Sequence, residues 1–247
     1  MVFGGKKQGF TLAEVLITLT IIGVIAALTI PTLMKKYDEA ATVSKVKKMY
    51  TTIANAVRVW QVENGCDTDV GDCLKQYAKY DCKNAFGGIE KKLDIVARRY
   101  QNENVNNIDW LPETNYGLDG TEATDSWQGV NKLSQQSNRT CHYLFKNGTT
   151  MMAHFDTYRD SFFTFIDING KNKPNRVGID IFPIGIGSHN NKIKTVNPYY
   201  VEDDTGSSRG LCYYRDNMVC NPDICTKKNC SPTAYVLKNS KLPPITW

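Results

Sequence analysis

The feature that most constrains this chain is an apolar run near its N-terminus. Residues 10–34 read FTLAEVLITLTIIGVIAALTIPTLM and contain one charged side chain, Glu14. A helix of about 20 apolar residues crosses the roughly 30 Å hydrocarbon core of a bilayer. The run therefore predicts a membrane-spanning helix. The alternative is a secretory signal peptide, but such a peptide has a shorter apolar stretch and an A-x-A-like cleavage site, which is not evident here.

All eight cysteines lie beyond this run, and none lies within or before it. An even number of cysteines confined to one side of a membrane segment predicts disulfide bonds in an oxidising compartment. A zinc site is the alternative, but the sequence has no C-x-x-C pair. The positive-inside rule is balanced, because two lysines precede the run and two follow it. The cysteines therefore favour a C-terminal part outside the cytoplasm. The disulfide candidates are Cys66, Cys73, Cys82, Cys141, Cys212, Cys220, Cys225 and Cys230.

Glu14 is the informative exception to the apolar run. A charged side chain inside a membrane is costly and is by default a functional hypothesis that needs a partner. A cut between Gly9 and Phe10 would create an α-amino group one helical turn before Glu14, within reach of the same chain or of a neighbouring copy. An ion pair between subunits would offset the burial only when the subunits are in register. We therefore predict that Glu14 sets the register of assembly; the alternative is an exposed glutamate near the helix start.

The segment KKQGFTLAEVLITLTIIGVIAALTIP resembles the processing and methylation motif of type IV prepilins and type II secretion pseudopilins. The matching residues are Gly9, Phe10, Glu14, Gly23 and Pro31. The resemblance implies cleavage after Gly9 by a prepilin peptidase and N-methylation of Phe10. It also implies a single-pass protein of the bacterial inner membrane, with its head outside the cytoplasm. From the membrane it would join a pilus or pseudopilus filament through its helix. Its partners in the filament would be copies of itself or other pilin-like subunits, and assembly would take place at an inner-membrane assembly platform.

The helical pattern resumes after Pro31. Apolar residues recur at spacings of three and four, which places them on one helical face, and Asn64-Gly65 predicts the end of the helix. Residues 10–64 would form one helix of about 80 Å. Small residues such as Gly23 let membrane helices approach closely. The apolar stripe consists of Val43, Val46, Tyr50, Ile53, Val57 and Trp60.

These segments predict four parts of the chain. They are a leader at 1–9, a transmembrane or polymerisation helix at 10–34, an amphipathic stem helix at 35–65, and a globular periplasmic or extracellular head at 66–247. The head is large for a simple major pseudopilin, which favours a minor or specialised subunit.

The head pattern predicts two short helices followed by a small antiparallel sheet. The helices are expected at Leu74–Tyr80 and Ile89–Tyr100. Strands at Cys141–Lys146 and Thr149–Asp156 flank Asn147-Gly148, a strong hairpin signal. Ser161–Ile168 and Val177–Ile186 are β-branched and aromatic and predict two further strands. A long helix followed by such a sheet is an α+β order, with disulfide-stapled loops completing a pilin-like head.

The segment DINGKNKPNRVGID between the last two predicted strands offers several side-chain oxygens. Calcium takes oxygen ligands from such loops, which makes Asp167, Asn169, Asn172 and Asp180 candidate calcium ligands. The EF-hand pattern is incomplete, because Lys171 stands at its fifth position and no glutamate closes the loop. A turn capped by its Asn and Asp side chains is the favoured interpretation. No other cofactor is predicted.

Enzyme motifs such as G-x-S-x-G, H-E-x-x-H and a phosphate-binding glycine loop do not occur in the sequence. The formal net charge of +5 is too weak to indicate nucleic-acid binding by itself. We therefore predict a structural filament subunit without catalytic activity. The alternative is a minor tip subunit that acts as an adhesin or captures DNA, for which Tyr199-Tyr200 and Tyr213-Tyr214 could form a ligand surface. The sequence is compatible with both a pilus and a secretion pseudopilus.

Overall fold

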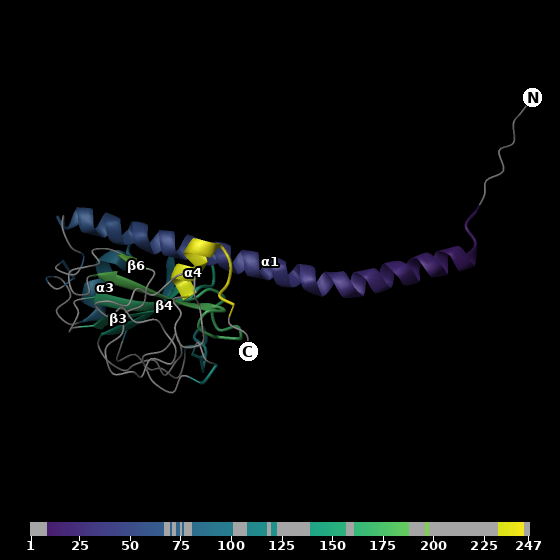
Figure 1. Ribbon diagram of the computed structural model, residues 1–247. Helices are drawn as coiled ribbons and strands as arrows, with labels where there is room; N and C mark the ends of the chain where they lie inside the picture. Colours follow the sequence, from purple (N-terminus) through teal and green to yellow (C-terminus); the bar gives the residue numbers. More distant parts are fainter. Residues whose placement is uncertain are drawn as a thin grey trace, which may run out of the picture. The chain divides into compact units, whose positions relative to one another are not determined.

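The computed structural model describes residues 9–66, 70, 73–74, 76, 81–100, 108–117, 120–122, 139–156, 161–187, 196–197 and 232–244. The chain divides into two compact units, Met1–Ala41 and Thr42–Trp247. Helix α1, Leu12–Glu63, belongs to both, because its first half lies in the first unit and its second half in the second (Figure 1). The predicted single helix over residues 10–64 is thus confirmed to within two residues.

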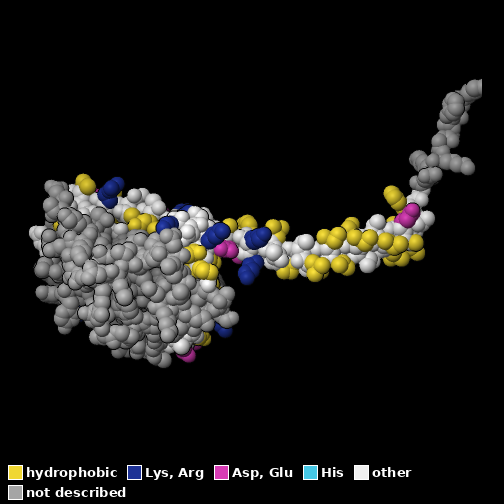
Figure 2. All heavy atoms as spheres, in the orientation of Figure 1, with side chains coloured by type: hydrophobic (Ala, Val, Ile, Leu, Met, Phe, Trp, Pro, Cys, Tyr) yellow, Lys and Arg dark blue, Asp and Glu magenta, His cyan; other side chains and the backbone are white. Residues whose placement is uncertain are grey.

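The first unit consists of the N-terminal half of α1. Its large apolar side chains are exposed, and Pro31 does not interrupt the helix. The structure therefore contains a helix that is long and apolar enough to cross a membrane, by length and composition. Apolar side chains line the visible face of this unit in Figure 2.

The second unit begins with the amphipathic half of α1. The predicted stripe is confirmed, because Val43, Val46, Ile53, Val57 and Trp60 are buried and Tyr50 is partly buried. Met49 and Ala56 extend the buried face. The helix ends where Gly65 takes φ +65°, a left-handed conformation that glycine adopts without strain.

Six strands form one antiparallel sheet within the described residues, in the spatial order of their sequence. The Asn147-Gly148 hairpin is confirmed, since it joins the second and third strands with Gly148 at φ +83°. The strands are β1 Ile95–Tyr100, β2 Thr140–Phe145, β3 Thr150–Asp156, β4 Ser161–Asp167, β5 Ile181–Gly187 and β6 Val196–Asn197. The predicted α+β class is confirmed: the fold is a long apolar helix plus an antiparallel sheet, with disulfide-bonded cysteines.

The two faces of the sheet pack against different parts of the head. One face joins the buried stripe of α1 and helix α3, Cys82–Glu90, in the larger apolar core. The opposite face packs Met152, Phe165 and Ile181 against the loop residues Ile108 and Leu111. A short C-terminal helix, α4 Pro232–Asn239, attaches to β5 through Thr233, whose hydroxyl donates to the carbonyl of Pro183 at 2.5 Å.

The close approach of α3 to α1 depends on one glycine. A Cβ atom added at Gly88 would overlap the indole ring of Trp60, whereas one added at the preceding residue, Gly87, would meet nothing within 4 Å. With the Trp60 ring in this position, residue 88 has room for glycine alone.

Two predictions of local structure were wrong. The segment expected to be a helix at Ile89–Tyr100 is instead the end of α3 and strand β1. Asp81 caps α3 by accepting a hydrogen bond from the Lys83 amide, so the helix starts seven residues earlier, at Cys82. The β-branched Ile95-Val96 pair then starts a strand that pairs with β2. The strand expected at Val177–Ile186 begins only at Ile181, because Gly178 at φ +85° bends the backbone. Most of the helix expected at Leu74–Tyr80 lies outside the described residues.

Candidate assembly site

The start of α1 is fixed by a reciprocal pair of residues, Thr11 and Glu14. The amide and the hydroxyl of Thr11 both donate to Oε2 of Glu14, each at 2.8 Å. The amide of Glu14 donates in return to the hydroxyl oxygen of Thr11 at 3.3 Å. This is a capping box, in which a Thr-x-x-Glu sequence satisfies helix N–H groups that have no partner within the helix.

The capping box leaves half of the carboxylate available. Among the residues that the structure describes, Oε1 of Glu14 has no hydrogen-bond or ion-pair partner, because every contact of this side chain goes to Oε2. Phe10, at which processing would create the new amine, lies just before α1 and is 88% exposed. The first unit thus presents an exposed acceptor close to the predicted N-terminus of the processed chain.

The remaining predicted assembly residues lie further along the same helix. Gly23 and Pro31 follow Glu14 at nine and seventeen residues and do not contact it, so the structure does not bring these residues together. A Cβ atom at Gly23 would meet nothing within 4 Å, and Gly9 is equally open. Gly23 is therefore not needed for packing within the subunit. The roles of Gly9, Phe10, Glu14, Gly23 and Pro31 in processing and assembly stay predictions.

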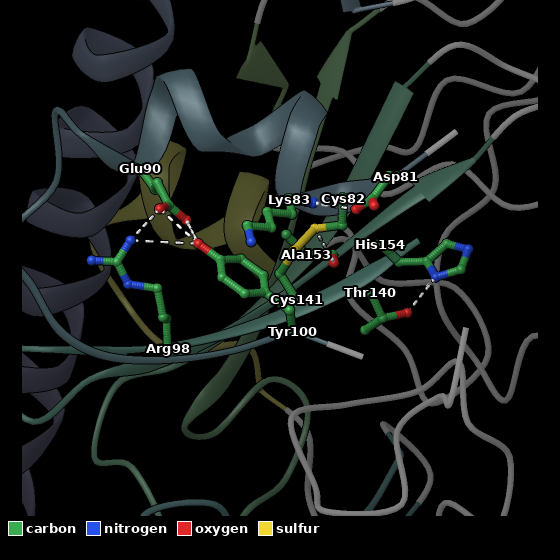
Figure 3. Close-up of a disulfide and its surroundings, with 10 residues drawn as sticks. All are labelled: Asp81, Cys82, Lys83, Glu90, Arg98, Tyr100, Thr140, Cys141, Ala153 and His154. Carbon is green, nitrogen blue, oxygen red and sulfur yellow. Dashed lines mark hydrogen bonds and ion pairs between the residues drawn. A yellow bond between two sulfur atoms is a disulfide. The ribbon is translucent and has the colours of Figure 1, made fainter. Parts of the chain in front are cut away.

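Two disulfide bonds are present in the described part of the head. Cys66 pairs with Cys73 directly after α1, and Cys82 pairs with Cys141, which joins the start of α3 to β2 (Figure 3). The prediction of disulfide bonds is confirmed. Cys212, Cys220, Cys225 and Cys230 lie outside the described residues.

A polar cluster that no local sequence pattern predicts holds β1 against α3. Oε1 of the buried Glu90 accepts hydrogen bonds from Arg98 at 2.6 Å and from the Tyr100 hydroxyl at 2.8 Å (Figure 3). Lys83 lies 5.3 Å from the centre of the Tyr100 ring. Burial raises the pKa of Tyr100 above its ordinary value, which keeps the hydroxyl protonated as a donor. The cluster anchors an edge strand beside the Cys82–Cys141 bond.

The turn between β4 and β5 brings Asp167, Asn169 and Asp180 together. The carboxylate of Asp180 accepts from the amides of Asn175 at 2.8 Å and Arg176 at 2.5 Å, and from the Asn169 side chain at 3.2 Å. Oδ1 of Asp167 accepts from the Asn169 amide at 3.2 Å. Asn172 takes part as a donor, because its side-chain nitrogen donates to the carbonyl of Asn169. These contacts fit the capped-turn interpretation, and calcium binding stays a prediction.

Burial sets the protonation of this turn. Burial, and then the nearby charge of Asp180, together raise the pKa of Asp167 to about 9. Burial also raises the pKa of Asp180, against the opposing effect of the backbone donors. Within the described residues, no group of three or more His, Cys, Asp or Glu side chains is placed to hold a metal ion.

The two described histidines lie inside the sheet. Burial and then the charge of Arg99 lower the pKa of His142 to about 3, so its imidazole is neutral at physiological pH. Nδ1 of His154 lies 2.8 Å from the hydroxyl of Thr140. Both side chains are buried at 2% exposure, which fits packing residues of the sheet. His189 lies outside the described residues.

Comparison with known proteins identifies the N-terminal segment. A family model described as the prokaryotic N-terminal methylation motif matches residues 5–30. This motif is the signature of type IV pilins and pseudopilins, and the chain carries it at its N-terminus. The matched stretch includes Gly9, Phe10, Glu14 and Gly23, and Pro31 follows it directly. No curated protein and no solved structure matches the chain.

Thr11 is the residue in the motif region whose contacts were not anticipated. The signal was present in the sequence, since Thr11-x-x-Glu14 before an apolar run is the pattern of a capping box. Glu90 and Arg98 had no comparable signal, because their contact depends on how α3 and β1 pack.

Proposed function

We propose that this protein is a structural subunit of a type IV pilus or a type II secretion pseudopilus, assembled through the first half of α1. The observation that carries the proposal is the N-terminal methylation motif on a helix whose large apolar side chains are exposed in its first unit. A soluble protein rarely exposes so large an apolar surface, and such a surface marks an interaction with lipid or with another protein. Lipid would cover it in the membrane, and neighbouring stems would cover it in a filament.

Processing precedes assembly in this proposal. A prepilin peptidase cuts the chain after Gly9 on the cytoplasmic side, and Phe10 becomes the N-methylated first residue of the mature subunit. The match of the motif across residues 5–30 supports both events, since the matched residues include the proposed cut site after Gly9 and the charged Glu14. An inner-membrane assembly platform then receives the mature subunit.

The head lies outside the cytoplasm in this proposal. The disulfide bonds Cys66–Cys73 and Cys82–Cys141 support that orientation, because such bonds persist in oxidising compartments and are rare in the cytosol. The subunit carries no catalytic activity of its own. It contributes by positioning its head on a filament.

Mass spectrometry of the mature N-terminus tests the proposal most directly. We expect assembled material to begin with N-methylated Phe10, with the first nine residues removed. An intact Met1 in assembled material, or a chain that begins after Ala27, would contradict processing by a prepilin peptidase. A Gly9→Val variant, which blocks the proposed cut while leaving α1 unchanged, should accumulate as a full-length membrane protein.

A minor tip subunit with a binding role is the second candidate, favoured by the size of the head. The tyrosine pairs that could form its ligand surface, Tyr199-Tyr200 and Tyr213-Tyr214, lie outside the described residues. Images of cells with and without the chain distinguish the two roles. Loss of all filaments indicates a major subunit, whereas intact filaments with lost surface or DNA binding indicate a minor one.

A further inference from the structure

We infer that the outward face of the second half of α1 docks onto a different pilin-like subunit whose own stem carries carboxylates, rather than onto a second copy of this chain. This inference rests on the proposed function and deepens it, because it names the chemistry of the partner. We call this surface the basic face. Its charged residues are Lys45, Lys48 and Arg58.

The basic face lies opposite the part of α1 that packs into the head. On the packed side, the Tyr50 hydroxyl donates to the carbonyl of Val196 at 3.2 Å, and Lys47 donates to the Ser240 hydroxyl at 2.6 Å. Lys and Arg side chains are visible along α1 in Figure 2. Between residues 42 and 62, the exposed positions of α1 hold three basic side chains and no acidic one. The other exposed residues are Ser44, Thr51, Asn55, Val59 and Val62.

The three cations have no counter-charge within the described part of the chain. Neither an ion pair nor a side-chain hydrogen bond of Lys45, Lys48 or Arg58 occurs among the described residues. The acidic residue that follows the face, Glu63, is in an ion pair with Lys92. The face therefore presents three positive charges along about 20 Å of helix, at a rise of 1.5 Å per residue.

A second copy of the chain is a poor match for this face. It would bring the same three cations, and like charges placed against each other suppress association. The acidic residues just before the face, Asp38 and Glu39, would supply two carboxylates for three cations even if both were available. A cation left unpaired between packed stems costs more than one in water. A stem with carboxylates at the facing positions pairs with all three cations.

Two exposed valines make the basic face a contact surface as well as a charged one. Val62 is 76% exposed and Val59 is 44% exposed, three residues apart and therefore neighbours on the helix. In the described part of the second unit, Val96 is the other large apolar side chain that is exposed. Protein interfaces combine apolar contacts with charged residues around them. The face offers both to a neighbouring stem.

The test uses a charge-reversed copy of the chain as the acidic stem. Lys45→Glu, Lys48→Glu and Arg58→Glu are combined in one full-length chain, and this chain is mixed with the wild type in an uncharged mild detergent. Fluorescence energy transfer between labelled chains gives the apparent dissociation constant of each pair. The uncharged detergent ensures that no anionic headgroup neutralises the face.

A matched control changes the net charge by the same amount elsewhere. It combines Lys146→Glu, Lys171→Glu and Lys173→Glu, which replace exposed lysines that lie outside α1. A neutral variant with glutamine at the three positions of the basic face completes the set. All the replaced side chains are exposed, so thermal unfolding of each variant should match that of the wild type and shows that the head is folded.

We expect the mixed pair to bind about tenfold more tightly than the wild-type chain binds itself, as three surface ion pairs predict. The control variant should stay within about twofold of wild-type self-association, because it leaves the face unchanged. The neutral variant should bind itself more tightly than the wild type does, since the repulsion is removed. Salt should weaken the mixed pair and strengthen wild-type self-association, because it screens both effects.

Several outcomes overturn the inference. Equal affinity of the mixed pair and the wild-type pair would show that the basic face is not a contact. A control variant that prefers the wild type as strongly as the reversed chain does would show that net charge decides. Wild-type self-association that salt weakens would make a second copy the occupant. Loss of the preference in micelles that contain phosphatidylglycerol would assign the face to anionic lipid.

Failure of the proposed function looks different from failure of this inference. In that case no pair associates, the mixed pair included, and the chain in cells keeps its first nine residues. The inference would then fall with the proposed function. A correctly processed chain whose mixed and wild-type pairs associate equally would overturn the inference alone.

Discussion

The two halves of α1 are both rich in apolar residues but have opposite surroundings. In the first unit the apolar side chains surround the helix and are exposed, whereas in the second unit they form one stripe that is buried. The first half therefore has no role in stabilising a fold within the subunit and is available to lipid or to other chains. The second half is the central helix of the head. The difference teaches that the half with its apolar residues on one face packs into the core, whereas the half that is apolar all round does not.

This comparison predicts that equivalent truncations have unequal effects in the two halves. Trp60→Ala should lower the free energy of unfolding of the head by about 3–5 kcal/mol, because it removes a large buried side chain and leaves a cavity. Leu16→Ala, in the exposed half, should leave it unchanged. Denaturant unfolding of the purified full-length chain in mild detergent, followed by head fluorescence from the remaining tryptophans, measures both.

A large loss of stability in Leu16→Ala would contradict the division between the halves. It would mean that the first unit contributes to the head fold. The same preparation of Leu16→Ala should instead show reduced association between subunits.

The Cys82–Cys141 bond should contribute the next largest effect. Replacing both cysteines by serine should cost about 2–4 kcal/mol, because the bond closes a long loop between α3 and β2 and constrains the unfolded chain. The pair Cys66–Cys73 closes a loop of only seven residues and should cost less. Thermal unfolding of the two double variants ranks them, and a larger loss for the short loop would contradict the loop-length argument.

A neighbouring pair of glycines tests how closely α1 must approach α3. Gly88→Ala should destabilise the head by about 1–3 kcal/mol, since the new methyl group would overlap the Trp60 indole. Gly87→Ala is the matched control and should be neutral or stabilise by up to about 1 kcal/mol, because alanine favours the helix and has open space there. Equal effects of the two substitutions in thermal unfolding would show that Trp60 can move aside.

Much of this architecture could be predicted from residue patterns. The long helix, its end near Gly65 and the Asn147-Gly148 hairpin each have a local cause, namely apolar periodicity, a C-terminal glycine and a turn that requires positive φ. The helix α3 and strand β1 could not be placed, because Ile89 continues an apolar pattern across the boundary between them. Their separation depends on the Asp81 cap and on the pairing of β1 with β2, which is distant in sequence.

The same distinction, between contacts with a local sequence pattern and contacts that depend on packing, applies to the functional residues. Glu14 is conspicuous in the sequence because a charge in an apolar run needs a reason, and its Thr11 partner follows from spacing alone. The Glu90 cluster and the Gly88 contact involve residues that come together only when α1, α3 and β1 pack. No local pattern identifies such contacts.

The buried Asp167 in the turn between β4 and β5 gives the head a pH dependence. The pKa of Asp167 is raised from its ordinary value to about 9, so the folded state keeps a proton that the unfolded state releases between about pH 4 and pH 9. The contribution of Asp167 to stability should be greatest below pH 4 and should fall as the pH rises through that window, by at most about 1.4 kcal/mol per pH unit. Asp167→Asn, which stays neutral, should flatten the slope, and an unchanged slope in denaturant unfolding at several pH values would contradict the assignment.

Calcium should have the smallest effect of all, if the capped-turn interpretation holds. The oxygens of Asp180 already accept three hydrogen bonds from the protein, so adding Ca²⁺ at neutral pH should leave the melting temperature of the full-length chain unchanged. A rise in melting temperature that disappears in Asp180→Asn would instead establish a metal site formed by Asp167, Asn169, Asn172 and Asp180. Magnesium is the control ion, because it demands near-octahedral geometry and dehydrates reluctantly. A rise with both ions that persists in Asp180→Asn would reflect general ionic effects on the head rather than this turn.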